Sequence, residues 1–453
     1  MKRIFLSLIA IIFMANIGFS QDITGSWYGV LEVSTVKLRM VINIVKTDKG
    51  YTSTLDSPDQ GTKGMAASST KFENSELTVE LGNGAVKYTG KLSDDGTIIG
   101  TFSQAGANYP LNLTRDKPAE LLRPQEPKPP FPYYSEDVKF TNPKGNITLA
   151  GTLTLPKKEG VFPVVVLISG SGAQNRNEEV FGHKPFLVLA DHLTRNGIGV
   201  LRYDDRGVGE SGGDFGAATS NDFANDVESA VSFLKGRKEV DKNKIGLIGH
   251  SEGGIIAQMV AANSSDVSYI VLLAGTGVSG DAILLRQKEL IERGSGVPEA
   301  AIKRGQDIMK GAYQIIESSD DTAGVKEELT EYFKGKQLPE KDASAIAGQL
   351  SSPWMQFFIR YDPAPLLAKV KVPVLALIGE KDLQVPPDIN LTAIKAALEK
   401  GGNKHVTVKE LPKLNHLFQE SETGLPSEYG KIEQTISPVV LDEITSWIKE
   451  QTK

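Results

Sequence analysis

The sequence predicts an α/β fold with a doubly wound, mostly parallel sheet, preceded by a small antiparallel β-barrel or sandwich domain. Three observations support this prediction. Apolar strands alternate with helical patterns after residue 135, short alternating strands fill residues 21–115, and a proline-rich stretch separates the two regions. A chain of 453 residues is also long enough for more than one domain. We therefore expect two folded domains of different architecture.

The first twenty residues have the pattern of a secretory signal peptide. Lys2 and Arg3 precede an apolar run from Ile4 to Phe13, and small or polar residues follow as far as Ser20. A transmembrane anchor is the alternative, but it needs about 20 apolar residues, and this run is interrupted too early. We expect a signal peptide at residues 1–20 and a mature protein that is secreted or periplasmic, with no membrane span.

Residues 21–115 predict the antiparallel β domain. Short alternating runs are separated by the turn sequences DKG, NG and DDG, which are typical of hairpins. The runs are Val30–Val33, Leu38–Val45, Leu77–Leu81 and Ile98–Phe102. Residues 116–134 then hold six prolines and predict a stiff, extended linker.

Six apolar segments in residues 135–453 predict the strands of the parallel sheet. Each is rich in Val, Ile and Leu, and near-continuous apolar strands are typical of a sheet covered on both faces. The segments are Val161–Ser169, Gly197–Asp204, Lys244–His250, Val267–Gly275, Val372–Glu380 and His405–Pro412. Between the fourth segment and the fifth lies a stretch of roughly eighty residues with helical periodicity, which is too long for an ordinary connection.

Composition excludes several kinds of chemistry. The absence of Cys rules out thiol nucleophiles, thiolate zinc sites and iron–sulfur clusters. A net charge of -6, from 50 basic and 56 acidic residues, argues against general binding to nucleic acid or anionic lipid. No His-Glu-x-x-His pattern, calcium loop or dinucleotide fingerprint is present, so we expect neither metal nor cofactor. The expected partners are small molecules or neutral polymers.

The pattern Gly-x-Ser-x-Gly occurs twice, around Ser211 and around Ser251. A nucleophile elbow requires a strand, a sharp turn and a helix, with glycines where the two elements pack closely. Only the second match has this context, since Lys244–Ile248 predicts a buried strand and Ile255–Ala262 an apolar helix. We therefore assign Ser251 as the nucleophile and give Ser211 a structural role.

A serine nucleophile needs a base, and the base needs an acid to orient it. Of the five histidines, His416 is the best candidate for the base because it follows the last predicted strand, at the end of the sheet where the elbow opens. Asp382, after the preceding strand, is the expected acid, and Glu380 is the local alternative. The order Ser251, Asp382, His416 differs from the orders of the two classical serine protease types.

An acyl-transfer site must also stabilise the oxyanion of the tetrahedral intermediate. One donor is expected to be the backbone N–H of Glu252, directly after the nucleophile. The second is expected in the small-residue loop after the first apolar segment, from Ser171 or, as a second choice, Gly172. A simple glycine turn that ends the strand is the alternative for this loop.

Together these motifs resemble the α/β-hydrolase superfamily over residues 135–453, close to bacterial serine carboxylesterases and to dienelactone-hydrolase or prolyl-oligopeptidase-like domains. Gly249–Gly253 matches the family's elbow, Gly379–Asp382 its acid loop, His416 its terminal histidine and Asp205–Ser211 its loop after the fourth strand. One departure is Ser169-Gly170, where many members carry His-Gly. The resemblance implies an α/β-hydrolase fold with a helical cap, here at about residues 277–365.

Within that cap, Trp354 and Phe358 are candidates for lining an acyl pocket, although packing of the cap on the sheet explains them equally well. His183 is a further candidate for bordering the site. We expect a carboxylesterase that works through an acyl-enzyme on a small-molecule ester, with acylated sugars among the candidates. Two alternatives remain: a serine peptidase of the prolyl-oligopeptidase-like kind, and a catalytically inactive glycan-binding protein.

Overall fold

The computed structural model describes residues 22–33, 36–58, 62–84, 86–104, 107–117, 122–320 and 322–453. The expected signal peptide at residues 1–20 lies outside these residues. The chain forms two compact units. One contains most of the chain up to residue 117, and the other contains the chain from residue 118 onward together with residues 31–39 and 57–63. Among the described residues, no helix is both long and apolar enough to cross a membrane.

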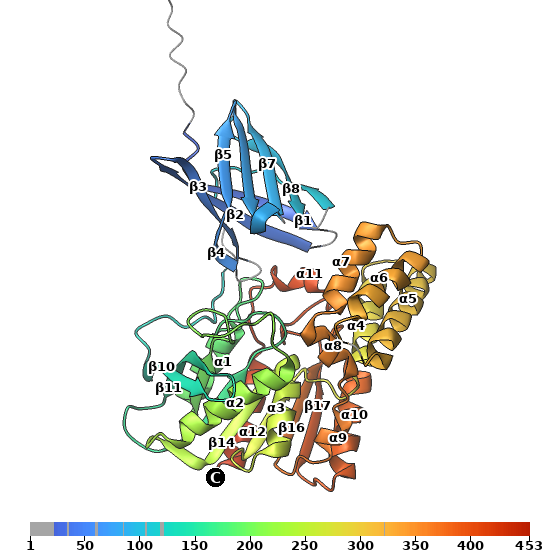
Figure 1. The fold of residues 1–453 in the computed structure, drawn as a ribbon. Coiled ribbons are helices and arrows are strands. Elements are labelled where there is room, and N and C mark those ends of the chain that lie inside the picture. The colour runs from blue at the N-terminus through green and yellow to red at the C-terminus, as the bar shows by residue number, and fades with distance from the viewer. Residues whose placement is uncertain are drawn as a thin grey trace, which may run out of the picture. The chain divides into compact units, whose positions relative to one another are not determined.

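The N-terminal part consists of two antiparallel sheets, as the alternating pattern predicts (Figure 1). One sheet has the order β1-β2-β3-β4 and comprises Gly25–Val33, Val36–Thr47, Gly50–Ser57 and Thr62–Ala66. The other has the order β5-β6-β7-β8-β9 and comprises Ser69–Glu73, Glu76–Leu81, Val86–Leu92, Ile98–Gln104 and Ala107–Pro110. Tyr88 fills the interior, where its hydroxyl donates to the Leu111 carbonyl over 3.2 Å. Gly90 and Gly100 make room for this ring, because a Cβ at either position would lie within 2.5 Å of the Tyr88 hydroxyl.

The proline-rich stretch is described over residues 122–133, where it contains neither helix nor strand. Arg123 donates to the carbonyls of Gly430 and Ile432, each over 2.9 Å. Gln125 donates to the Ile436 carbonyl over 2.7 Å and accepts from the Thr435 amide over 2.6 Å. This part of the linker is therefore bonded along the C-terminal unit.

The C-terminal unit is built on an eight-stranded mixed sheet with the order β10-β11-β13-β12-β14-β15-β16-β17. Its strands are Tyr134–Asn142, Ile147–Leu155, Gly199–Tyr203, Phe162–Ile168, Val240–His250, Tyr269–Leu273, Val374–Gly379 and Val406–Leu411, in that order. β10 and β11 pair antiparallel, and every pair from β13 to β17 is parallel. Every residue of β13, β15 and β16 is buried, so both faces of the sheet are covered. The predicted α/β fold is confirmed.

Helices that connect or follow the strands cover the sheet. They are α1 (Pro185–Arg195), α2 (Ser220–Lys235), α3 (Glu252–Asn263), α10 (Pro387–Lys400) and α12 (Pro438–Gln451), and the short helix α11 (Pro426–Tyr429) lies in the connection from β17 to α12. Helix α2 begins with a capping box, in which Thr219 and Asp222 bond reciprocally. Helix α3 has almost all of its residues buried, in keeping with its place behind the elbow.

Between β15 and β16 the chain forms a group of helices that Figure 1 shows at one side of the sheet. They are α4 (Gly280–Gly294), α5 (Glu299–Ser318), α6 (Val325–Gly335), α7 (Glu340–Leu350) and α8 (Pro353–Arg360), and the short helix α9 (Ala364–Leu367) follows them and lies against α3 and α10. This cap has a core of its own, which includes Tyr313, Leu329, Phe333 and Ile359. Helix α8 has two apolar faces. Ile359 belongs to the core of the cap, whereas Trp354 and Phe358 pack on the core of the sheet.

Candidate active site

Ser251 lies at the sharp turn between β14 and α3. Its backbone has a φ of 54° and a ψ of -118°, a conformation that a non-glycine residue adopts only under strain. A Cβ on Gly249 would lie 2.0 Å from the Gly253 carbonyl oxygen, and one on Gly253 would lie 2.1 Å from that of Ile168. Strand and helix therefore approach so closely that only glycine fits at these positions. The segment has the geometry that a nucleophile elbow needs.

Ser211, the other motif match, has a different environment. Its hydroxyl donates to the Asp204 carbonyl over 2.7 Å and accepts from the Ala150 amide over 2.9 Å. The residue is buried, and both bonds join it to backbone of neighbouring segments. Ser211 therefore holds the loop after β13 against β11, in agreement with the structural role that the sequence indicates.

Asp382 and His416 form a buried pair. The Nδ1 atom of His416 lies 2.8 Å from Oδ2 of Asp382, while Oδ1 of Asp382 accepts from the amides of Gln384 and Val385, each over 2.8 Å. Because the carboxylate fixes the proton on Nδ1, Nε2 of the neutral ring is left as an acceptor. Glu380 is exposed and accepts from the Lys413 amide over 2.8 Å, so its carboxylate stabilises the loop rather than orienting the ring.

A cavity of about 70 Å³ opens at the elbow. It is bordered by the elbow, the loop after β12, the loop after β16 and the cap helices α4 and α8. Five of the predicted site residues line it together: Ser251, Glu252, Ser171, Trp354 and Phe358. The rings of Trp354 and Phe358 stack on each other, with their centroids 5.1 Å apart.

The loop after β12 carries the expected oxyanion donors. The amide of Gly170 donates to Glu178 Oε1 over 2.7 Å and is therefore not available to an oxyanion. The next two amides, of Ser171 and Gly172, remain the expected donors. Ser171 lines the cavity at the elbow, whereas Gly172 lines a much smaller space of about 10 Å³ beside Asp205.

The side chain of Glu252 has a position that the sequence did not predict. It is buried, and its Oε1 accepts from the Ser220 hydroxyl over 2.6 Å and from the Trp354 indole over 2.7 Å. Burial raises the pKa of Glu252, against the lowering effect of these two hydrogen bonds. The sequence predicted a role only for the backbone N–H of Glu252. The contact of its side chain with Trp354 could not be predicted, because the two residues are 102 positions apart in the chain.

His183 does not border the cavity, and the expected substrate contact is wrong for this residue. Its side chain is fully buried, with Nδ1 bonded to the Thr435 hydroxyl over 3.0 Å. Its Nε2 lies 3.0 Å from the Tyr429 carbonyl and 2.9 Å from the Gln419 amide. Burial lowers the pKa of His183 to about 4, so the ring is neutral and serves the packing of the C-terminal segment.

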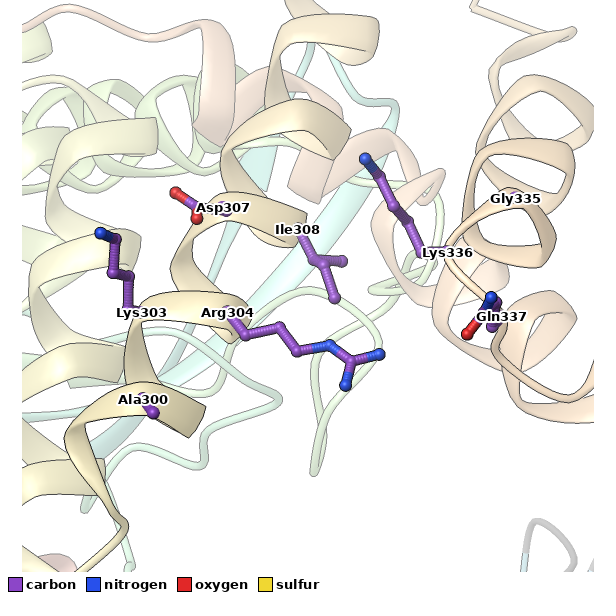
Figure 2. A pocket seen from close by; sticks show the side chains of 8 residues that line it. All are labelled: Ala300, Lys303, Arg304, Asp307, Ile308, Gly335, Lys336 and Gln337. Carbon is purple, nitrogen blue, oxygen red and sulfur yellow. The ribbon is translucent and has the colours of Figure 1, made fainter.

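A larger hollow of about 520 Å³ lies within the cap, between α5 and the turn after α6 (Figure 2). Lys303, Arg304 and Lys336 border it, and all three side chains are exposed. None of the predicted site residues lines it, so its size does not make it the candidate active site. Among the described residues, no group of three or more His, Asp or Glu side chains could hold a metal ion.

Comparison with known proteins gives the family. The family model described as "Serine aminopeptidase, S33" (Hydrolase_4) matches residues 184–422, more than half of the chain. The esterase EstD of Thermotoga maritima is 28% identical over 383 residues, which cover 83% of this chain and 80% of that protein. An esterase structure from Pyrococcus furiosus is 18% identical with a TM-score of 0.42, covering 70% of this chain and 90% of its own. Est1E of Butyrivibrio proteoclasticus, solved with ferulic acid, is 16% identical with a TM-score of 0.41, covering 70% of this chain and 99% of its own. The chain therefore belongs to the Hydrolase_4 family of α/β hydrolases, and it carries an N-terminal β domain before the hydrolase fold.

Proposed function

We propose that this carboxylesterase-type hydrolase cleaves small-molecule carboxylic esters through an acyl-enzyme on Ser251. The observation that carries the proposal is the buried pair of His416 and Asp382, with 2.8 Å between Nδ1 and Oδ2, at the end of the sheet where the Ser251 elbow opens. A buried carboxylate bonded to the far nitrogen of a histidine is the arrangement that activates a serine hydroxyl. The naming of EstD as an esterase supports the same substrate class.

The reaction follows from these positions. Ser251 Oγ attacks the ester carbonyl while Nε2 of His416 accepts its proton, and Asp382 stabilises the imidazolium that forms. The backbone N–H groups of Glu252 and of Ser171 or Gly172 stabilise the negative oxygen. His416 then gives its proton to the leaving alcohol. In the second half, His416 takes a proton from water as the water oxygen attacks the acyl carbon. His416 then returns this proton to Ser251 Oγ as the bond between the acyl carbon and Oγ breaks, which releases the acid and restores the serine.

The size of the cavity favours a short acyl group. About 70 Å³ is available between the elbow and the stacked rings of Trp354 and Phe358, and these rings offer an apolar wall. We therefore expect acetyl and propionyl esters to be better substrates than long-chain esters. Acetylated sugars belong in the test panel for this reason.

The deciding experiment compares two serines. Ser251→Ala is expected to abolish hydrolysis of a short-chain aryl ester and labelling by a fluorophosphonate probe. Ser211→Ala is the matched control, since it removes the hydroxyl of the other motif match, and it should retain both activities. Turnover by the Ser251→Ala variant at the rate of the unmodified protein would rule out the proposal.

A second candidate is a serine peptidase, because the family description names an aminopeptidase. Aminoacyl-anilides compared with aryl esters of matched leaving group would decide between the two. A third reading, an inactive protein that binds glycan, is favoured only if neither substrate is turned over and the probe fails to label Ser251.

Export is the remaining part of the proposal. The pattern of residues 1–20 supports a cleaved signal peptide, with a secreted or periplasmic mature protein. N-terminal sequencing of the protein from a producing cell is expected to begin at Gln21. A chain that still begins at Met1 in the cytoplasmic fraction would contradict it.

A further inference from the structure

His250, the residue directly before the nucleophile, connects the elbow to two other loops. Its Nδ1 lies 2.9 Å from Oε1 of Glu178, in the segment that precedes α1. Its Nε2 lies 3.0 Å from the main-chain carbonyl oxygen of His416. The His250 side chain is buried, so these contacts are shielded from water.

The two contacts fix the protonation of the ring. A carbonyl oxygen can only accept, so Nε2 of His250 must carry a proton. Oε1 of Glu178 already accepts from the Gly170 amide over 2.7 Å, and a negative oxygen makes this bond stronger. A carboxyl group is also the stronger acid of the pair, so the shared proton belongs on Nδ1. His250 then carries both ring protons and Glu178 is a carboxylate.

Glu178 joins the pair to the oxyanion loop. Its Oε1 receives both the Gly170 amide and the His250 ring, so the loop after β12 and the elbow share one acceptor atom. Glu178 is buried and has a φ of 50°, a left-handed conformation that is uncommon for a glutamate. Strain of this kind persists only where the surrounding contacts fix the residue.

The charged groups that act on His250 are carboxylates. Glu178 faces it from the segment before α1, and the Asp382 carboxylate acts on it from the loop after β16. The ring of His416 lies 4.8 Å away and that of Phe418 6.4 Å away, measured between centroids. Burial alone would lower the pKa of His250, but the Glu178 carboxylate, the His416 carbonyl and the Asp382 carboxylate together outweigh it and raise the pKa.

We propose that His250 is a positioning residue, held as an imidazolium in a buried ion pair with Glu178, and that this pair fixes the His416 loop and the oxyanion loop on the elbow. The proposal rests on the proposed function for its catalytic part. The ion pair itself does not depend on the reaction. His250 touches no reacting atom, and it acts through the main chain of His416 and the amide of Gly170.

A spectroscopic test measures the protonation state of His250 in the absence of substrate. In protein labelled with ¹⁵N-histidine, both ring nitrogens of His250 are expected to be protonated at pH 7.5, where an ordinary histidine with a pKa of about 6.5 is mostly neutral. His250→Asn identifies the signal among the five histidines. Glu178→Gln keeps the size of the side chain but removes its charge, and should return the ring to a neutral form. A neutral His250 at pH 7.5 in the unmodified protein would overturn the proposal.

A kinetic test measures whether His250 positions the catalytic residues. The amide nitrogen of Asn lies near the place of Nδ1 and that of Gln near the place of Nε2, so His250→Asn and His250→Gln each keep one of the two bonds. Both are expected to lower kcat for a short-chain aryl ester about 10-fold to 100-fold, while KM changes by less than about threefold. The matched control is His405→Gln, at an exposed histidine, which should leave kcat unchanged.

The two readouts separate the failures. A doubly protonated His250 in a protein that hydrolyses no ester would contradict the proposed function and leave the ion pair standing. Normal kcat in both His250 variants, with esterase activity present, would overturn the positioning role. If the variants do not fold, as thermal melting would show, the nitrogen signals of the unmodified protein decide.

Discussion

The indole nitrogen of Trp354 donates a hydrogen bond to the carboxylate of Glu252 over 2.7 Å. Trp354 is the second residue of cap helix α8, and Glu252 directly follows Ser251. The first residue of α2, Ser220, donates to the same oxygen over 2.6 Å. The cap, the elbow and α2 are thus joined at one buried atom that lies beside the cavity. The position of the cap and that of an expected oxyanion donor depend on each other.

Trp354→Phe is predicted to lower kcat/KM for short-chain aryl esters by about 10-fold, because the cap loses its bond to Glu252 while an aromatic wall remains. The buried carboxylate loses one of its donors, so the free energy of unfolding should also fall by about 1–3 kcal/mol. Trp447→Phe on α12 is the matched control and should leave kcat/KM unchanged. Steady-state kinetics and urea unfolding measure the two effects. An unchanged kcat/KM for Trp354→Phe would show that this bond does not support the site.

Asp382→Asn is predicted to lower kcat by about 10³-fold to 10⁴-fold, because the amide cannot stabilise a charged His416 and favours the wrong tautomer. Its shape is preserved, so the amides of Gln384 and Val385 keep an acceptor and the protein should fold. Glu380→Gln is the matched control, since it removes the neighbouring exposed carboxylate, and kcat should stay within about twofold. The opposite ranking of the two variants would make Glu380 the acid.

Much of the fold was predictable because its strands are locally distinctive. The six apolar segments correspond to β12 to β17. β13, β15 and β16 are buried along their whole length, whereas β17, at the edge of the sheet, has one buried residue, Leu411. β10 and β11 were missed. In β10, exposed and buried residues alternate, and the strand pairs on one side only, at the edge of the sheet. An edge strand that is polar on one face has the same pattern as an ordinary exposed segment.

The candidate site divides in the same way. Ser251, Asp382 and His416 were assigned from sequence because each follows a strand, and the parallel sheet brings the ends of its strands to one edge. The contacts of Glu252 with Trp354 and of His250 with Glu178 could not be assigned, because each joins segments far apart in the chain and has no local pattern. His183 was misplaced for a related reason, since its polar neighbours in sequence do not show that its ring faces the interior.

Asp205 is predicted to make stability depend on pH. Burial raises its pKa from 3.8 to about 8, and the nearby carboxylates of Glu252 and Glu178 act in the same direction. The folded protein therefore keeps a proton that the unfolded chain releases near pH 3.8. Stability from this group is complete below that pH and is lost as pH rises through about 8. The melting temperature should therefore decrease as the pH is raised from 6 to 9. This interval extends from roughly two units below the pKa of Asp205 to roughly one unit above it.

Asp205→Asn tests the cause. The amide oxygen can still accept from Gln174, and the amide nitrogen can donate to the Ser169 hydroxyl, which now bonds Oδ1 over 2.8 Å. The variant has no proton to lose, so its melting temperature should change less over the same pH interval. An equal change in both proteins would place the pH dependence in another group.

Ser211→Ala is predicted to cost stability without loss of activity. The substitution leaves the Ala150 amide without its acceptor in the interior, and the Asp204 carbonyl loses a donor. An unsatisfied buried group costs about 1–3 kcal/mol, which should appear as a lower midpoint in urea unfolding with an unchanged slope. Ser318→Ala, at an exposed hydroxyl that bonds within its own helix, is the matched control and should change the free energy of unfolding by less than about 0.5 kcal/mol. Ser211 and Ser251 are each the central residue of a Gly-x-Ser-x-Gly pattern. A loss of esterase activity in the folded Ser211→Ala variant would therefore contradict the assignment of Ser251 as the nucleophile.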